Sequence, residues 1–180
     1  MKEKEISYLT ISQLNIKRPL PNDDYSMLTW GLRDTYPRIK VYLTKNVKKE
    51  DGTTDYSKVI IAPFTFPVLY TFIDTLESLI NDETPVVTKL TCFNNKFVDD
   101  KRTDEIVVQA EIKLAKSDQG VINIGIKLPT GWMYFPLEVD TTWHKFYDKN
   151  NNEITDKKIL SALYAKAYVK LLRNAFAIKI

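Results

Sequence analysis

Cationic and aromatic residues alternate with aliphatic ones between Arg38 and Lys45. Arg38, Lys40 and Tyr42 occupy every second position, an aliphatic residue fills each position between them, and Lys45 follows. Successive side chains of a β-strand point to opposite faces, so a strand here would expose the polar row with about 7 Å between neighbours. Lys and Arg pair with phosphates, and an unpaired base stacks on an aromatic ring with a gain of about 1–3 kcal/mol. The pattern is typical both of a surface for single-stranded nucleic acid and of an ordinary solvated sheet face.

Two further groups of side chains could enlarge such a surface. Trp30 and Arg33 precede this segment and Lys58 follows it, each on an expected neighbouring strand. A dense aromatic and basic cluster occurs later in the chain, at Lys127, Trp132, Tyr134, Trp143, Lys145, Phe146 and Tyr147. Because large aromatic side chains usually pack in the core, we expect at least half of this second cluster to be buried.

One tripeptide raises the hypothesis of a nuclease. Glu111-Ile112-Lys113 resembles the Glu-x-Lys core of restriction-type nucleases, in which two carboxylates hold Mg²⁺ and the lysine stabilises the attacking hydroxide. The second carboxylate would come from Asp99, Asp100 or Asp104. In those enzymes that acid normally begins a separate preceding strand, whereas Asp104 abuts the strand expected for Glu111. The tripeptide therefore gives only weak support for a metal site.

The sequence offers no other catalytic constellation. Cys92 and His144 are the only residues of their kinds and lie in different expected elements, so a cysteine–histidine pair is not expected. Phosphate-binding glycine loops and serine-elbow motifs are absent from the sequence. We therefore predict a protein that is not an enzyme and that requires no cofactor or metal.

Composition indicates a single globular domain over all 180 residues. The hydrophobic share of 44% is ordinary for a folded domain, and a formal net charge of +3 selects no partner without a clustered face. A single cysteine fits a reducing compartment, and the N-terminus lacks the apolar core of a signal peptide. Pro63 and Pro67 interrupt the longest apolar stretch. We expect a cytoplasmic protein that does not span a membrane.

The first half of the chain is predicted to form four strands and a helix. The strands are expected within residues 5–16 and at 27–33, 38–45 and 58–62, with a polar break at 19–24 and a hairpin loop at 48–52. Apolar residues at three- and four-residue steps predict a helix at 67–81, with Pro67 at its first position.

The second half is predicted to repeat this order. Strands are expected at 86–93, 105–116, 121–128 and 133–142, and a helix at 156–176. Alternation predicts one buried strand face, formed by Ile106, Val108, Ala110, Ile112 and Leu114. The core stripe of the last helix is expected at Leu160, Leu163, Tyr164, Ala167 and Leu171. The fold class is therefore α+β, with two four-stranded antiparallel units, each followed by a helix, in halves of approximately 1–83 and 84–180.

This order of elements carries a resemblance to known single-strand binders. The basic strand 38–45, a charged loop with Gly52, the apolar strand 58–62 and the following helix resemble the binding core of the transcriptional coactivator positive cofactor four. The doubled order is similar to the Whirly proteins, and proteins of this fold also serve bacteriophages as single-stranded DNA-binding proteins. The resemblance implies an oligomer with helices at its centre and sheets that expose a basic and aromatic face.

Carried over by position, the resemblance implies a set of contacts with nucleic acid: Arg38, Lys40, Tyr42, Lys45 and Lys58. The lysine-rich signature that Whirly proteins carry on the second strand has no clear counterpart at Trp30 and Arg33.

We therefore predict sequence-tolerant binding of single-stranded DNA by a homo-oligomer, in DNA replication or recombination, and in the host cytoplasm if the protein is viral. RNA is an alternative ligand, because no residue pattern here reports on the 2′-hydroxyl. Two other hypotheses compete with this one. The first is a protein-interaction or assembly module that uses the same sheet against another polypeptide, and the second is the Mg²⁺-dependent nuclease.

Overall fold

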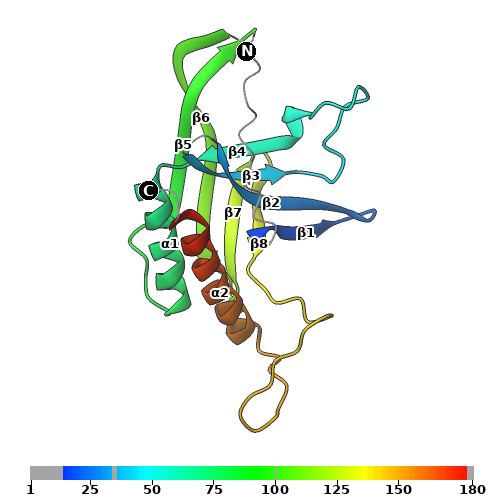
Figure 1. Cartoon of the computed structure of the whole chain (residues 1–180), viewed down its shortest axis with the longest axis vertical. Helices are drawn as coiled ribbons and strands as arrows, with labels where there is room; N and C mark the ends of the chain where they lie inside the picture. The colour runs from blue at the N-terminus through cyan, green and yellow to red at the C-terminus, as the bar shows by residue number, and fades with distance from the viewer. Residues whose placement is uncertain (1–13, 34–35, 100, 178–180) are drawn as a thin grey trace.

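Two four-stranded antiparallel sheets, each followed along the chain by a helix, make up the computed structural model, which describes residues 14–33, 36–99 and 101–177 (Figure 1). The first sheet has the order β1-β2-β3-β4, with β1 at Ile16–Leu20, β2 at Asp24–Arg33, β3 at Tyr36–Tyr42 and β4 at Val59–Pro63. The second sheet has the order β5-β6-β7-β8, with β5 at Lys89–Val98, β6 at Lys101–Lys116, β7 at Ile122–Leu128 and β8 at Gly131–Pro136. The helices are α1 at Phe66–Ile80 and α2 at Lys157–Ala177, and a single helical turn, η2, spans Tyr56–Lys58. The predicted fold class is confirmed.

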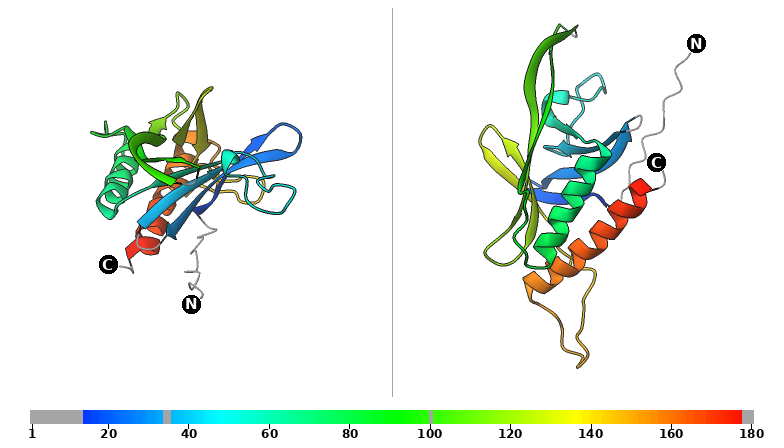
Figure 2. Two further views of the ribbon diagram at one scale, coloured as in Figure 1. Left: turned by 90° about the horizontal axis from the view of Figure 1, so that it is seen from above. Right: turned by 90° about the vertical axis from the view of Figure 1, so that its left-hand side faces the viewer.

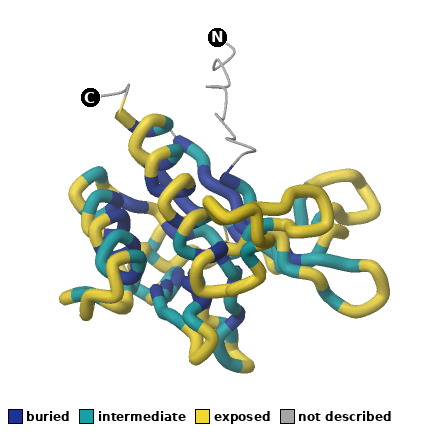
Figure 3. The backbone as a smooth tube through the Cα atoms, turned by 90° about the horizontal axis from the view of Figure 1, so that it is seen from below, coloured by how far each residue is buried: buried dark blue, intermediate teal, exposed yellow. Residues whose placement is uncertain are grey.

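The two helices lie side by side against the sheets (Figure 2). Buried residues concentrate where the helices and sheets meet, and exposed residues follow the projecting loops and hairpins (Figure 3). Neither helix among the described residues is long and apolar enough to cross a membrane.

The prediction of a polar break at residues 19–24 was wrong, because these residues belong to the hairpin of β1 and β2. β1 runs through Pro19, and β2 already begins at Asp24. Because β1 is an edge strand, the missing N–H of proline is tolerated there. Asn22 and Asp23 join the strands with φ angles of 60° and 56°, a left-handed conformation that tight hairpin turns require and that short polar residues tolerate. Most of the strand expected within residues 5–16 lies outside the described residues.

Only part of the predicted face of β6 is buried, because a β-bulge interrupts the strand. Cys92 pairs with Ala110, but the next residue of β5 pairs with Val108, so Gln109 is an extra residue in β6. One extra residue reverses the alternation of side chains, because successive residues of a strand point to opposite faces. The predicted positions from Ala110 to Leu114 are buried, whereas Ile106 and Val108 are exposed.

An aromatic cluster around Trp30 ties the first sheet to the helices. The Trp30 ring lies 5.4–5.9 Å, centroid to centroid, from three phenylalanines, Phe64, Phe72 and Phe176. Its Nε1–H donates a hydrogen bond of 2.8 Å to the Tyr168 hydroxyl, which donates one of 3.0 Å to the carbonyl oxygen of Leu14. The cluster satisfies the polar atoms of two large buried side chains within the core.

Helix α2 buries a different stripe from the predicted one. Leu160 is buried as expected, and Tyr164 and Leu171 are half-buried against the core, but Leu163 and Ala167 are exposed. The buried stripe instead contains Ser161, Ala165, Tyr168, Val169, Leu172 and Phe176. Apolar residues surround much of this helix, so their spacing does not select one face, and the contact of Tyr168 with Trp30 does.

Candidate nucleic-acid interface

Strand register decides which side chains of β2 and β3 share a face. Trp30 pairs with Ile39, and both residues are buried in the core. Thr29 pairs with Lys40, so this neighbouring pair points to the opposite, outer face of the first sheet. Other pairs on the outer face are Met27 with Tyr42, Gly31 with Arg38, and Tyr25 with Pro19 of β1. The predicted alternation of Arg38, Lys40 and Tyr42 with the aliphatic row is confirmed.

A groove of about 460 Å³ lies on this outer face. Its lining contains four cationic residues and two tyrosines, at Arg38, Lys40, Lys45, Lys48, Tyr25 and Tyr42. Asp and Glu are absent from the described residues that line it, although Asp23 and Asp24 contact Lys45 at one end. The volume falls in the range of sites for small organic ligands, which is also the scale of individual nucleotide units.

The three residues of β3 lie at different depths in the groove. Lys40 and Tyr42 are half-buried, which leaves part of each side chain open to a ligand. Arg38 is only 6% exposed, deeper than the exposed position that the sequence predicts. Its cross-strand partner on β2 is Gly31, which has no side chain to fill the space beside the long arginine stem. Arg38 therefore contributes to the floor of the groove, and Lys40 and Tyr42 to its accessible wall.

Tyr25, Lys17 and Lys48 are site residues that the sequence analysis missed. Tyr25 lines the groove, and the ammonium of Lys17 lies 4.8 Å from the centre of the Tyr25 ring in a cation–π contact. Lys48 joins the lining from the loop after β3. Alternation of Tyr25, Met27 and Thr29 could have revealed this face, had the strand been extended back to Asp24.

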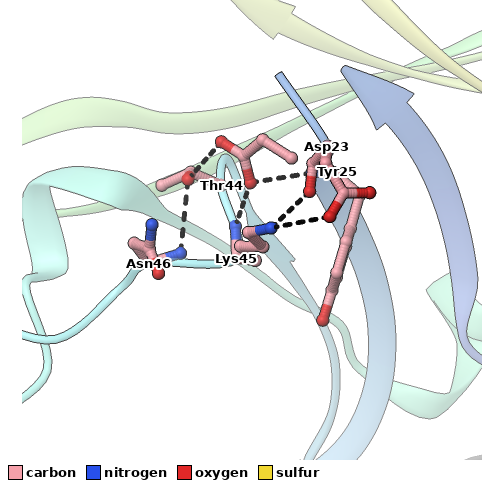
Figure 4. Close-up of polar contacts among 6 residues, drawn as sticks. Asp23, Tyr25, Thr44, Lys45 and Asn46 are labelled. Carbon is pink, nitrogen blue, oxygen red and sulfur yellow. Dashed lines mark hydrogen bonds and ion pairs between the residues drawn. The ribbon is translucent and has the colours of Figure 1, made fainter. Parts of the chain in front are cut away.

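The turn at Asp23 and Asp24 holds the loop after β3 at one end of the groove (Figure 4). The Asp24 carboxylate accepts hydrogen bonds from the Thr44 hydroxyl at 2.6 Å and from the backbone N–H of Lys45 at 2.8 Å. These hydrogen bonds, that of Thr44 first, hold the pKa of Asp24 below its ordinary value. The Lys45 ammonium donates to the carbonyl oxygen of Asp23 and lies 3.6 Å from its carboxylate. Lys45 therefore lines the groove, but Asp23 already offsets part of its charge.

The structure places the three other predicted contacts differently from Lys40 and Tyr42. Trp30 borders the groove, but it is only 1% exposed and belongs to the core, so the prediction that it extends the exposed surface was wrong. Lys58 ends the η2 turn instead of starting β4, is absent from the groove lining, and pairs with Asp55 at 3.5 Å. The side chain of Arg33 lies outside the described residues.

The second sheet carries aromatic rings on its outer face as well. The ammonium groups of Lys113 and Lys127 lie 6.0 and 5.5 Å from the centre of the Trp132 ring. Tyr134 lies close over Gly125, where a Cβ atom would come within 2.8 Å of the tyrosine ring. A side chain at position 125 would therefore displace the ring, and glycine leaves it room.

The expectation that half of the second aromatic cluster is buried was wrong. Trp132 and Tyr134 are half-buried, and the cluster members Trp143, Phe146 and Tyr147 are exposed on the loop before α2. Alternation along β8 sends Met133 and Phe135 into the core, and these residues seal the sheet in place of the tryptophans.

The residues of the nuclease hypothesis are not brought together. Glu111 forms an ion pair with Lys89, and Lys113 faces the Trp132 ring. Asp104 lies seven residues from Glu111 on the same strand, a separation of roughly 23 Å, and Asp100 lies outside the described residues. Within the described part of the chain, no group of three or more His, Cys, Asp or Glu residues could hold a metal ion.

Comparison of the chain with protein-family models, with curated proteins and with solved structures finds no match. The resemblance to the Whirly and positive cofactor four proteins therefore rests on the order of strands and helices.

Proposed function

We propose that this protein binds single-stranded DNA in the groove on the outer face of β2 and β3. The observation that carries the proposal is the gathering of four cations and two tyrosines in one groove whose described lining contains no carboxylate. In this arrangement Lys40 and Lys48 contact phosphates, and Tyr25 and Tyr42 stack on unpaired bases. Arg38 supports the floor, and Lys45 contributes a weaker, partly offset charge.

The same chemistry favours single strands over duplexes and tolerates any sequence. A duplex hides the faces of its bases in the stack, whereas a single strand can lay each base on a tyrosine ring. Stacking uses the π-face that every base has, so it does not read base identity. An RNA strand offers the same phosphates and base faces, and it is expected to compete for the groove.

A second platform of the same kind extends the proposal to the other sheet. Trp132 offers an indole ring with Lys113 and Lys127 beside it, which is the combination of ring and cations found in the groove. A strand long enough to reach both sheets would gain a second set of contacts. We expect longer oligonucleotides to bind more tightly than those that fill the groove alone.

The proposal is tested by fluorescence anisotropy with a labelled twelve-nucleotide oligothymidine and a duplex of the same length. We expect the single strand to bind at least tenfold more tightly. Tyr42→Ala should weaken single-strand binding, whereas the matched control Tyr147→Ala, an exposed tyrosine on the loop before α2, should have a smaller effect. Equal affinity for the duplex, or equal losses for the two variants, would contradict binding in the groove. Absence of binding together with stable co-purification of a polypeptide would favour the interaction module.

A further inference from the structure

A second cavity, of about 630 Å³, lies where the edges of the two sheets meet. β1 and β8 are the edge strands there, and they lie side by side (Figure 1). The volume falls in the range of sites for small organic ligands. The lining comes from the segment of β1, from the end of β8 and the residue that follows it by two, and from α2, and it includes Asn15, Lys17, Pro19, Pro136, Glu138 and Tyr164. We refer to this space as the seam cavity.

The seam cavity adjoins the groove on the first sheet. Asn15 lines both of them. Lys17 lines the seam cavity, and its ammonium makes the cation–π contact with Tyr25 of the groove. Only β2 separates β1 from β3, so the axes of these two strands lie roughly 10 Å apart. A nucleic-acid strand bound in the groove can therefore place a neighbouring nucleotide in the seam cavity.

The apolar part of the lining suits a flat ring. Pro19 and Pro136 are apolar, and the half-buried Tyr164 adds aromatic surface. The Tyr164 ring lies 6.2 Å from the Tyr168 ring in a stacked arrangement, so the core supports it from one side. Nucleobases are flat rings that gain from contact with aromatic side chains.

Two carboxylates give the seam cavity hydrogen-bond acceptors that the groove lacks. Glu138 and Asp140 both line it, and Lys17 is the one cation in its described lining. Asp140 already accepts a hydrogen bond of 3.0 Å from the backbone N–H of Thr142, whereas the described residues give the Glu138 carboxylate no partner. An ionised carboxylate accepts hydrogen bonds and donates none. Glu138 is therefore available to a ligand that carries N–H donors.

The charges on the two sides of β1 favour a base over other ligands. The carboxylates of the seam cavity repel a phosphate, so the backbone of a bound strand stays with the cations of the groove and with Lys17. A cationic peptide would be attracted by those carboxylates but repelled by the four cations of the adjoining groove. A base of the bound strand is uncharged and meets neither repulsion.

We propose that the seam cavity binds one base of the strand held in the groove and prefers guanine. Guanine presents its N1–H and its N2 amino group side by side, and the two oxygens of Glu138 can accept both in a bidentate pair. Adenine and cytosine present one amino group on this edge, and thymine presents one N–H between two carbonyl oxygens, which the carboxylate repels. The inference rests on the proposed function and adds a preference at one nucleotide, while stacking in the groove stays tolerant of sequence.

Anisotropy with two labelled twelve-nucleotide strands, oligothymidine and a repeat of the triplet TTG, tests the inference. We expect the TTG repeat to bind about fivefold more tightly or better, which is the lower end of the discrimination given by a bidentate pair. Glu138→Gln should abolish most of this preference, because it sets an amide donor against the donors of guanine. The same variant should keep its affinity for oligothymidine within about twofold, because the charge of an exposed carboxylate is screened.

Glu83→Gln is the matched control. It removes the same charge from an exposed glutamate just after α1, outside the lining of the seam cavity, and it should keep the preference for guanine. A preference that survives Glu138→Gln, or one that both variants lose equally, would overturn the assignment. A TTA repeat that binds as tightly as the TTG repeat would also overturn it, because the gain would then come from purine stacking.

The two strands also separate this inference from the function proposed above. If oligothymidine and the TTG repeat bind the wild type equally well, the guanine site is refuted while binding in the groove stands. If neither strand binds, the proposed function fails and the guanine site fails with it.

Photo-crosslinking tests where the base lies. A TTG repeat in which 6-thioguanine replaces guanine should crosslink to peptides that contain β1, residues 136–140 or Tyr164. Crosslinks confined to β2 and β3 would overturn the placement of guanine in the seam cavity.

Discussion

Removal of the Lys40 charge should reduce the salt dependence of binding by a calculable amount. The groove offers four cations, and each phosphate contact on a single strand contributes a slope of about −0.7 to log K against log salt. The two lysines proposed to contact phosphates, Lys40 and Lys48, predict a slope of about −1.4, which is a loss of about sevenfold in affinity between 50 and 200 mM salt. Lys40→Gln leaves one contact, a slope of about −0.7 and a loss of about 2.6-fold over the same range.

The assay is anisotropy with the labelled oligothymidine at several salt concentrations. Lys149→Gln, which removes an exposed lysine from the loop before α2, is the matched control and should keep the wild-type slope. Lys45→Gln should change the slope little, because Asp23 already offsets the Lys45 charge. Affinity that does not vary with salt, or identical slopes for the Lys40 and Lys149 variants, would contradict phosphate contact by Lys40.

Three other predictions follow from the site and the core. Tyr25→Ala and Tyr42→Ala should each lose about 1–3 kcal/mol of oligonucleotide binding, whereas Tyr42→Phe keeps the stacking ring and should lose little in the same assay. Trp30→Phe should lower the free energy of unfolding in urea by about 2 kcal/mol, because it removes buried ring atoms and the donor to Tyr168. The same variant should bind the oligonucleotide nearly as well as the wild type. A variant of unchanged stability that no longer binds would show that Trp30 contacts the ligand. Hydrogen bonds from Lys116 and Lys158 lower the pKa of Asp82 to about 2 from an ordinary 3.8, so the stability that this carboxylate contributes is present above pH 3.8 and is lost as the pH falls through 2. Asp82→Asn, which suits the positive φ at this position, should therefore melt below the wild type at pH 7 and approach it only below pH 2. A melting difference independent of pH would contradict the assignment.

Local periodicity was sufficient for the helices and for most of the strands. The spacing of apolar residues predicts a helix at 67–81, and α1 spans Phe66–Ile80. Proline at the start of that helix and apolar residues at helical steps act within a few residues of one another, so no distant contact is needed to recognise them. The order of four strands and a helix, twice, follows from the same kind of local signal and is confirmed.

The sequence also predicts which strand face carries the candidate site, but it does not predict all the residues of that site. Alternation placed Lys40 and Tyr42 together opposite Ile39 because a strand has a period of two. Tyr25 and Lys48 join them only through the pairing of β2 with β3 and through the turn at Asp24, which the strand pattern of residues 38–45 does not contain.

On the remaining elements, contacts between residues far apart in the sequence decide how deeply a side chain is buried and on which face of its strand it lies. Trp30 is a core residue because Tyr168, 138 positions away, accepts its N–H, and its strand pattern is equally compatible with a surface ring. Ile106 and Val108 turn outward because Gln109 adds one residue to β6, a change that only the pairing with β5 reveals. Periodicity along the chain predicts which residues share a face, whereas the burial of those residues depends on which other element packs against that face.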